Sequence, residues 1–208
     1  MSRGKKQTSK ADILAATRKL IEESGYNKIS MRDVAAELGI SVGNLTYYYK
    51  SKLELIEAAI TDKQEHTEPL WPAETLAAVD ELLIRTQQLQ QRHVCYYRQY
   101  SQLAALSPVI LERQAEVYRK NEYTWTHTLI NLEQQKLLKP EWYEGQYRAF
   151  ISALLFLLSR WYEREALDQA LQIEPPGFRD TVWALITPLL SEEGKEQYRL
   201  MKQTERGL

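Results

Sequence analysis

The stretch SVGNLTYYYKSK, residues 41–52, places three consecutive tyrosines between a glycine-asparagine pair and two lysines. A helix turns by about 100° per residue, so a helix over 42–49 places Val42, Leu45 and Tyr49 on one face. These side chains are apolar or aromatic, and we expect their face to be the core side. The stretch therefore predicts a short helix that is anchored to a core on one side only.

The opposite face of this helix carries small, polar and aromatic side chains together. Asn44, Tyr47 and Tyr48 fall on it, and Thr46 lies at their flank. Gly43 lies one turn before Tyr47, where a larger side chain would obstruct the close approach of another molecule. Because two exposed tyrosine rings present a large area to water, we expect another molecule to cover them.

The residues before this stretch predict two more helices and a tight turn. Ser9 with Asp12 has the spacing of a capping box, and apolar residues at helical spacing follow as far as Gly25. A second start of this kind at Ser30 is followed by about two turns of helix, which end at Gly39. The order of helix, short helix, glycine-containing turn and short helix is that of a helix-turn-helix.

The distribution of charge separates the first quarter of the chain from the rest. The formal net charge of the 208 residues is only −1, but residues 1–52 hold ten Lys and Arg against five Asp and Glu. Residues 53–208 hold 17 basic and 23 acidic side chains. A basic segment around a helix-turn-helix indicates a nucleic-acid partner.

A DNA duplex would cover the outer face of the third helix. The major groove admits a helix, and there Asn and Thr can bond base edges while Tyr hydroxyls donate to phosphates. Lys50 and Lys52 would reach phosphates beside the groove, and the basic N-terminal arm would contact the backbone or the minor groove. The alternative, in which all three tyrosines pack against the following domain, stays open at this point.

The segment ISMRDVAAELGISVGNLTYYYKSKLELI, residues 29–56, resembles the DNA-binding segment of the tetracycline-repressor (TetR) family of bacterial transcription regulators. The resemblance covers residues 9–57 and rests on the Asp-Val-Ala run, two glycines, the aromatic cluster and the Lys-Ser-Lys sequence. It implies an all-α protein with a three-helix DNA-binding domain over 1–52. It also implies a larger helical domain over 53–208 that binds a small effector and dimerises.

The same resemblance implies which residues contact DNA. Lys50 and either Tyr47 or Tyr48 are expected to contact phosphates. The region from Val42 to Thr46 is expected to contact bases. The family usually has an aromatic residue in place of Thr46 and often a histidine in place of Tyr48, so the DNA sequence it reads is not transferable. The expected DNA-contacting residues are Lys6, Ser30, Arg32, Val42, Gly43, Asn44, Thr46, Tyr47, Tyr48, Lys50 and Lys52.

Helical patterns fill the remainder of the chain. A fourth helix is expected from Ser51 to about His66, where TEPLWPAE ends it because its two prolines cannot continue a helix. Apolar residues then recur at helical spacing over about 74–105, 108–137, 141–165 and 178–190. The first of these stretches is expected to form two helices, although no Gly or Pro marks the break.

Residues 53–208 hold 17 of the 21 aromatic side chains, and many of these lie at helical spacing. Ligand pockets are mostly apolar and aromatic with a few placed polar groups. A pocket here would be lined by His93, Tyr96, Tyr97, Tyr100, Tyr118, Trp125 and His127. The alternative is that these aromatic side chains only fill the core of the domain.

Two apolar helices near the C-terminus favour a homodimer. The segment 145–164 is apolar around much of its circumference, which exceeds what one core contact requires. A four-helix interface between two copies would use both segments. The expected interface residues are Phe150, Leu154, Leu157, Leu158, Trp161, Phe178, Val182, Leu185 and Ile186.

Other classes of function find no support in the sequence. It contains no nucleophile elbow, phosphate loop, dinucleotide fingerprint or metal-spaced pair of histidines, so we expect no enzyme, cofactor or metal. The single cysteine, Cys95, fits the reducing cytoplasm, where we expect the protein to act. No apolar run reaches the ~20 residues that cross a bilayer, so no membrane partner is expected.

The expected partners are a palindromic double-stranded DNA operator, an unknown small-molecule effector and a second copy of the chain. We expect a repressor that the effector releases from DNA. The alternative is a DNA-binding regulator without a small-molecule ligand, whose helical body binds a protein partner.

Overall fold

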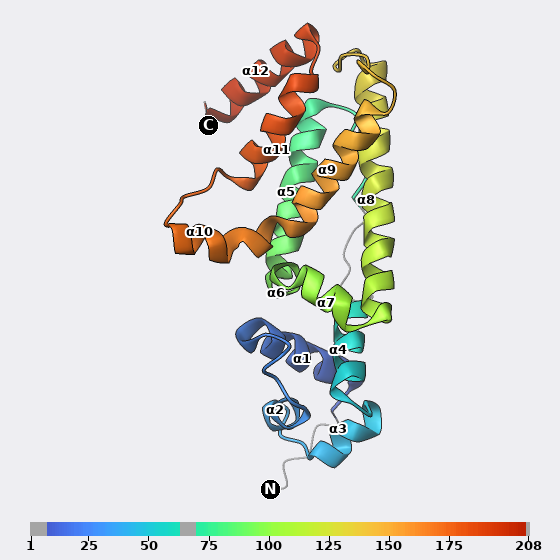
Figure 1. The fold of residues 1–208 in the computed structure, drawn as a ribbon, viewed down its shortest axis with the longest axis vertical. Coiled ribbons are helices and arrows are strands. Elements are labelled where there is room, and N and C mark those ends of the chain that lie inside the picture. Colours follow the sequence, from blue (N-terminus) through green and yellow to red (C-terminus); the bar gives the residue numbers. More distant parts are fainter. Residues whose placement is uncertain (1–7, 63–69, 207–208) are drawn as a thin grey trace, which may run out of the picture. The chain divides into compact units, whose positions relative to one another are not determined.

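Helices make up most of the structure (Figure 1). The computed structural model describes residues 8–62 and 70–206. Within these ranges the one extended pairing is an isolated antiparallel bridge between Leu138 and Leu190, so the all-α class is confirmed. Among the same residues, no helix is long and apolar enough to cross a membrane.

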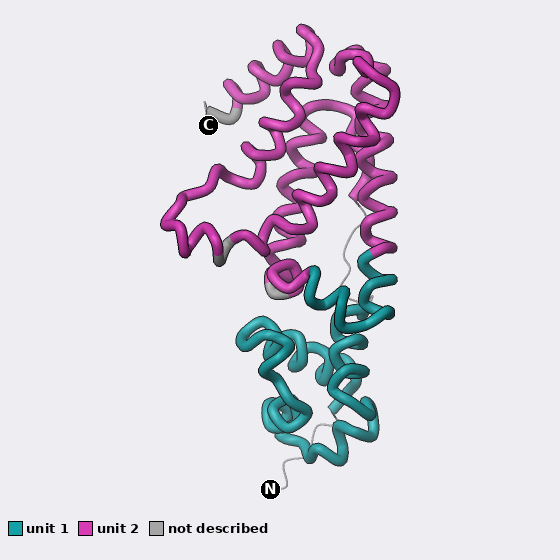
Figure 2. Tube along the Cα trace, in the orientation of Figure 1, with its two compact units in different colours: residues 1–67, 101–114 teal, residues 68–100, 115–208 magenta. Residues whose placement is uncertain are grey.

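The chain forms two compact units (Figure 2). Unit 1 comprises residues 1–67 and 101–114, and unit 2 comprises residues 68–100 and 115–208. The helix that begins after residue 51 belongs to unit 1, so the packing boundary lies later than the expected one at residue 52. The assignment of DNA binding to 1–52 and of effector binding and dimerisation to 53–208 stays a prediction.

Unit 1 begins with four helices that each start at a serine. They are α1 (Lys10–Ser24), α2 (Met31–Glu37), α3 (Val42–Tyr48) and α4 (Lys52–Thr61). The hydroxyls of Ser9, Ser30, Ser41 and Ser51 each accept the backbone N–H three residues further on. An N-cap of this kind stabilises a helix by about 1 kcal/mol, which matters most for helices as short as α2 and α3.

The core of unit 1 takes one fully buried side chain from each of these helices, namely Ile13, Val34, Leu45 and Leu55. α1 packs against both α2 and α4. Arg18 of α1 donates to the carbonyl of Ala59 and to Asp62 at the end of α4, both over 3.2 Å. α4 ends at Thr61, which is earlier than the expected end at His66.

Unit 2 is a bundle of longer helices. It contains α5 (Leu76–Arg92), α6 (Val94–Arg98), most of α8 (Pro108–Gln134), α9 (Gln146–Arg160), η2 (Trp161–Arg164), α10 (Glu165–Leu171), α11 (Phe178–Ile186), η3 (Thr187–Leu189) and α12 (Glu192–Arg206). Its core joins α5, α8, α9 and α11 through side chains such as Leu83, Leu129, Leu154 and Val182.

The expectation of two helices over 74–105 is wrong, because the structure has three: α5, α6 and α7 (Tyr100–Leu106). The breaks fall at His93 and Gln99, whose backbones leave the helical region with φ near −120°. Neither residue is a glycine or a proline. The local sequence therefore does not reveal these breaks.

α12 was not expected, because its sequence is strongly polar. Tyr198 and Met201 on one face pack against the core of unit 2. Its first turn closely approaches the segment that follows α8: a Cβ on Gly194 would collide with the carbonyl of Leu137. One apolar stripe and one glycine therefore allow α12 to pack against unit 2, although the mean composition of this segment does not indicate a packed helix.

Candidate nucleic-acid interface

α2 and α3 are joined by a tight turn with fixed geometry. Gly39 adopts φ +64°, in the left-handed region that glycine occupies without strain. In the capping box that starts α2, the hydroxyl and the backbone N–H of Ser30 both donate to Asp33. These bonds, the hydroxyl bond first, lower the pKa of the Asp33 carboxyl. The carboxylate is therefore charged at neutral pH and holds the start of α2.

α3 is anchored on one face and open on the other. Leu45 and Tyr49 are buried in the core of unit 1, as expected. The placement of Val42 on the core side is wrong, because 37% of its surface is exposed. Val42 directly follows the N-cap Ser41, ahead of the turn whose side chains reach the core. Gly43 and Asn44 are exposed beside it.

The two remaining tyrosines differ in exposure. Tyr47 is 77% exposed, whereas Tyr48 is half-buried and packs against the core of unit 1. Their rings meet edge to face with centroids 5.4 Å apart. The Tyr48 hydroxyl donates to the carbonyl of Thr8 over 3.4 Å, just before α1. Tyr47 therefore presents its ring to the surroundings, and Tyr48 holds the residue that precedes the N-cap of α1.

The two lysines after α3 differ in whether their side chains are already bonded to the protein. Lys50 is exposed, and its backbone N–H donates to Glu54 Oε2 over 2.6 Å. The ammonium of Lys52 donates to the carbonyl of Asn27 over 3.0 Å, which ties α4 to the segment between α1 and α2. Glu54 was not expected to have a role here, although its spacing from Ser51 is that of a capping box.

The other predicted contacts are spread over unit 1. Arg32 is exposed on α2 and forms no ion pair within the described residues. Thr46 is half-buried, and its hydroxyl donates to the carbonyl of Gly43 over 3.0 Å. Lys6 lies outside the described residues. The exposed residues at the start of α3, with Tyr47 one turn further on, make the surface that could enter a groove.

The residues proposed for an effector pocket fall into separate places. Tyr96, Tyr97 and Tyr100 form one aromatic cluster, in which the rings of Tyr97 and Tyr100 are stacked with centroids 6.2 Å apart. Burial raises the pKa of both the Tyr97 and the Tyr100 phenol. His93 ends α5 just before this cluster. We call Tyr96, Tyr97 and Tyr100 the tyrosine cluster below.

The three candidates on α8 lie apart from one another. Trp125 is buried in the core of unit 2, and Tyr118 is exposed. His127 is half-buried, and its Nδ1 lies 2.8 Å from the carbonyl of Tyr123. α8 therefore does not present these three side chains to one site.

Gln90 was missed in the sequence, because a glutamine at helical spacing carries no distinguishing signal. It is only 3% exposed, and its side-chain amide N–H donates to the carbonyl of Leu158 over 2.7 Å. Its side-chain oxygen has no hydrogen-bond partner in the described part of the chain. Arg160, two residues beyond Leu158, lies over the ring of Tyr100 at 5.9 Å. Gln90 and Tyr100 therefore each contact the last turn of α9.

The residues expected at a dimer interface need correction. Leu154, Leu158, Phe178, Val182 and Ile186 are buried in the core of unit 2, so they are not available to a second chain. Phe150, Leu157 and Trp161 are partly buried against the same core, and Leu185 is exposed. An apolar sequence indicates that a helix is buried. It does not indicate which face of the helix packs against its own chain and which face is left for a second chain.

The exposed face of α9 carries other residues. Ala149, Ser152, Ala153 and Phe156 lie on it, and Phe156 is 66% exposed. We call these four residues the α9 stripe. α9 has no charged side chain between Arg148 and Arg160, so the stripe is uncharged along its length.

Comparison with known proteins agrees with this architecture. Residues 13–59 match the family model described as bacterial regulatory proteins, tetR family. A TetR-family transcriptional regulator from Marinobacter aquaeolei VT8 has a similar structure, with a TM-score of 0.70 and 18% identity over 95% of this chain and 98% of that chain. None of the curated protein sequences compared with this chain matches it.

Two further solved structures are similar at lower TM-scores. The ketosteroid transcriptional regulator KstR2 of Mycobacterium tuberculosis has a TM-score of 0.53 and 17% identity, over 91% of this chain and 98% of its own. The fatty acid degradation regulator FadR from Bacillus halodurans has a TM-score of 0.56 and 15% identity, over 90% and 98%. At these identities the likeness concerns the fold.

A helix-turn-helix whose second helix has an uncovered polar face defines a DNA-binding regulator. The match over residues 13–59 and the shared fold make the assignment specific. The chain therefore carries a DNA-binding segment of the TetR family over residues 13–59 within a fold shared with TetR-family regulators, which confirms the resemblance found in its sequence.

Proposed function

We propose that this regulator is a dimeric repressor that reads a palindromic operator through the exposed face of α3 and leaves it when a small molecule binds unit 2. One observation carries the DNA-reading part. A short helix, capped at Ser41 and anchored through Leu45, leaves Asn44 and Tyr47 uncovered. Uncovered aromatic and amide groups on a rigid helix suit contact with base edges and phosphates.

Each residue of this face has a distinct proposed task. The side-chain amide of Asn44 makes no hydrogen bond within the described residues and can pair with a base edge, adenine above all. The Tyr47 hydroxyl and the Lys50 ammonium reach phosphates on either side of the groove. Gly43 allows the backbone of α3 to approach the duplex, since nothing but the Ser41 hydroxyl lies near its missing side chain.

Selection of genomic DNA fragments by the purified protein tests this part of the proposal. We expect the native protein to enrich a palindromic site and a Tyr47→Ala, Lys50→Ala variant to enrich none. The matched control, Tyr123→Ala with Lys120→Ala, changes the same residue types on the surface of α8 and should enrich the native site. Equal enrichment by all three proteins would contradict the proposal.

A dimer follows from the length of DNA that one helix can read. One helix-turn-helix contacts too few base pairs to select a site. Two-fold pairing doubles the number of base pairs that the protein contacts. The uncharged α9 stripe, together with the exposed Leu185 of α11, is the apolar surface that supports the proposed dimer. Small side chains such as Ala149 and Ala153 let two helices approach closely.

The proposed effector site lies at the tyrosine cluster and Gln90. A buried acceptor without a partner costs about 1–3 kcal/mol, so a ligand hydroxyl or N–H is favoured at the Gln90 oxygen. The tyrosine rings suit an apolar body beside that donor. Two structural relatives are named for ketosteroids and for fatty acid degradation. Apolar metabolites with one hydrogen-bond donor are therefore the first compounds to test.

Release from DNA would follow from a difference in affinity between two states of the dimer. A coupling of about 1–3 kcal/mol weakens DNA binding by roughly 5- to 150-fold when the effector is bound. By linkage, operator DNA weakens effector binding by the same factor. We place this competition between operator DNA and effector in the cytoplasm, where the protein has access to both DNA and metabolites.

A protein partner for unit 2 is a second candidate. The helix α10 exposes Leu167 and Leu171 on one side, and Ile173 follows them, each more than half exposed. Exposed apolar side chains that recur along one helix favour contact with another macromolecule. A thermal-shift screen separates the two candidates, because a small ligand that binds only the native state raises the melting temperature.

A further inference from the structure

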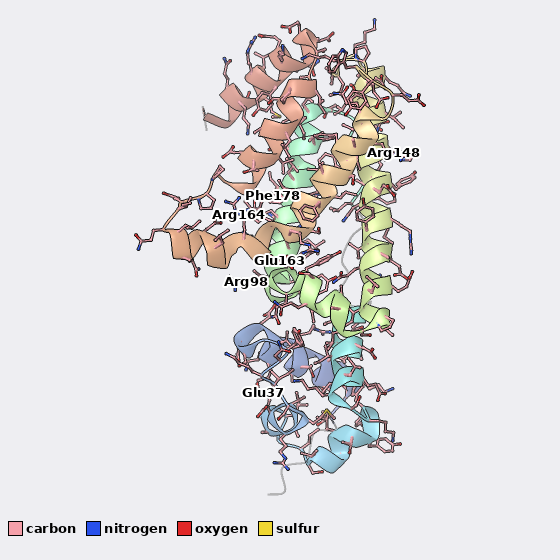
Figure 3. All side chains as sticks on the ribbon, in the orientation of Figure 1. Glu37, Arg98, Arg148, Glu163, Arg164 and Phe178 are labelled. Atoms are coloured by element: carbon pink, nitrogen blue, oxygen red, sulfur yellow. The ribbon has the colours of Figure 1, made fainter. Side chains whose placement is uncertain are left out.

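A row of polar side chains runs along the part of α8 that belongs to unit 2. Side chains project along the whole length of this helix (Figure 3), and Thr124, Thr128 and Asn131 recur on one face at helical spacing. Gln135, directly after α8, continues the same spacing. Thr124 and Thr128 are buried. We call these residues the α8 polar row.

The buried part of the α8 polar row bonds to a piece of irregular backbone. Residues 70–75 precede α5 and form neither helix nor strand, and we call them the strap. The Thr124 hydroxyl donates to the Leu70 carbonyl over 2.9 Å, and the Thr128 hydroxyl accepts the Ala73 N–H over 2.9 Å. Backbone groups outside helices and sheets need other partners when they are buried, and α8 supplies them here.

The remaining members of the α8 polar row continue this contact toward α5. The side-chain amide of Asn131 donates to the Ala73 carbonyl over 3.1 Å, and that of Gln135 donates to the Glu74 carbonyl. Thr75, the N-cap of α5, follows directly. The row therefore holds the strap from its first residue to the start of α5.

The strap ends the connection that leads out of α4. α4 ends at Thr61, and residues 63–69 precede the first bonded residue of the strap, Leu70. On the α4 side, the hydroxyl of the buried Ser107, which precedes α8, donates to Glu57. The chain is therefore bonded to α8, or to the residue before α8, on both sides of residues 63–69.

We propose that the α8 polar row determines which spacing between DNA half-sites the protein accepts. This inference rests on the proposed dimer that reads a palindrome through α3, and it assigns the choice of spacing to residues of unit 2 that touch no base. α8 passes from unit 1 into unit 2 as one helix, and the connection through residues 63–69 also joins the two units. A body held by one helix can tilt about it, and a short second connection limits that tilt.

The length of this connection sets the size of the effect. A chain reaches at most about 3.5 Å per residue, so residues 63–69 span at most about 25 Å. Release of the strap would extend the free connection to residue 74 and its maximal reach to about 42 Å. The added length of about 17 Å corresponds to about five base pairs of duplex, at ~3.4 Å each. A bonded strap therefore restricts the half-site separations that the two α3 helices can reach, and a released strap widens them.

Fluorescence anisotropy with the palindrome that the native protein selects tests this role. The probes are that palindrome, the same duplex with two base pairs inserted between the half-sites, and a single half-site. We expect the insertion to lower the affinity of the native protein about tenfold or more, and that of a Thr124→Val, Thr128→Val variant about threefold or less. Both proteins should bind the single half-site equally, because α3 is unchanged.

Thr86→Val is the matched control. Thr86 is also a buried threonine of unit 2, but its hydroxyl donates to the Leu82 carbonyl within α5. This variant should keep the native preference for spacing. A second variant carries Gly-Ser-Gly-Ser between residues 65 and 66, which lengthens the connection without changing the α8 polar row. It should tolerate the inserted base pairs as the double threonine variant does.

Hydrogen exchange shows whether the strap is released in the double threonine variant. The Ala73 amide should exchange faster than in the native protein. Native protection at Ala73 would overturn the claim that the α8 polar row holds the strap.

The DNA measurements separate this inference from the proposed function. If the native protein selects a palindrome and the double threonine variant is equally sensitive to spacing, the proposed function stands and the spacing role is overturned. A loss of half-site affinity in that variant would also overturn it, because the row would then act on folding and not on spacing. A native protein that selects no palindrome would remove the proposed function together with this inference.

Discussion

The indole N–H of Trp183 donates to Asp80 Oδ1 over 2.8 Å, which joins α11 to α5 inside unit 2. Arg179 donates to both oxygens of the same carboxylate. Asp80 is buried, and its charge is therefore held by two partners from one helix. This arrangement fixes α11, which borders the proposed dimer surface, to the centre of the bundle.

Removal of this carboxylate should be costly. Asp80→Ala leaves the Arg179 charge and the Trp183 N–H without their partner, and we expect a loss of about 3–5 kcal/mol in the free energy of unfolding. Glu81→Ala, which removes an exposed carboxylate from the next position, should cost less than about 1 kcal/mol. Chemical denaturation measures both. Similar losses for the two variants would show that the buried network contributes little.

Gly43→Ala should separate stability from DNA binding. Gly43 has ordinary negative φ and open space around it, so alanine should stabilise α3 by about 0.5–1 kcal/mol. The added methyl group obstructs the approach of α3 to the duplex, and operator affinity should fall. Denaturation and fluorescence anisotropy measure the two effects. A stabilised variant with native affinity would exclude close contact at this position.

High pH should destabilise unit 2 through three half-buried phenols. Burial raises the pKa of Tyr97 and Tyr100, and of Tyr147 to about 12, so the folded chain holds these protons more tightly than the unfolded chain. Their stabilising effect is complete below the unfolded pKa of about 10 and is lost as the pH rises through the folded values. Denaturation midpoints should fall over that range, and less so for a Tyr97→Phe, Tyr100→Phe variant. Midpoints that do not change with pH would contradict the raised pKa values of these groups.

Gln90→Leu should abolish the effector response without abolishing DNA binding. Leucine cannot accept the hydrogen bond that we propose for the ligand, so compounds that raise the melting temperature of the native protein should no longer do so. Thr181→Val is the matched control, because its hydroxyl oxygen is also buried without a hydrogen-bond partner among the described residues but lies on α11. An unchanged ligand shift in Gln90→Leu would place the effector elsewhere.

The DNA-binding unit was readable from the sequence because its signals are local. Serine caps, the Gly39 turn and the spacing from Leu45 to Tyr49 each depend on a few adjacent residues. Exposure within the unit was less predictable. Helical spacing alone assigned Tyr47 and Tyr48 to one face, but Tyr48 packs partly against the core and bonds to Thr8.

The sequence predicted that unit 2 is helical, but it did not predict which of its side chains are exposed. The spacing of apolar residues predicted helices over most of its length, but α12 depends on distant contacts and the breaks at His93 and Gln99 carry no local signal. The same limit affected the dimer residues. Leu154 and Phe156 both appear as apolar positions of α9, and packing alone distinguishes the buried leucine from the exposed phenylalanine.

The central claim, that the exposed face of α3 reads DNA sequence, is tested most directly by the specificity of an Asn44→Ala variant. Fluorescence anisotropy would give the affinity of native and variant protein for the selected palindrome and for a scrambled duplex, at one fixed salt concentration. We expect the variant to lose about 1–3 kcal/mol of discrimination at each half-site while its affinity for the scrambled duplex is kept. An unchanged ratio of the two affinities would show that Asn44 does not read bases and would contradict the account.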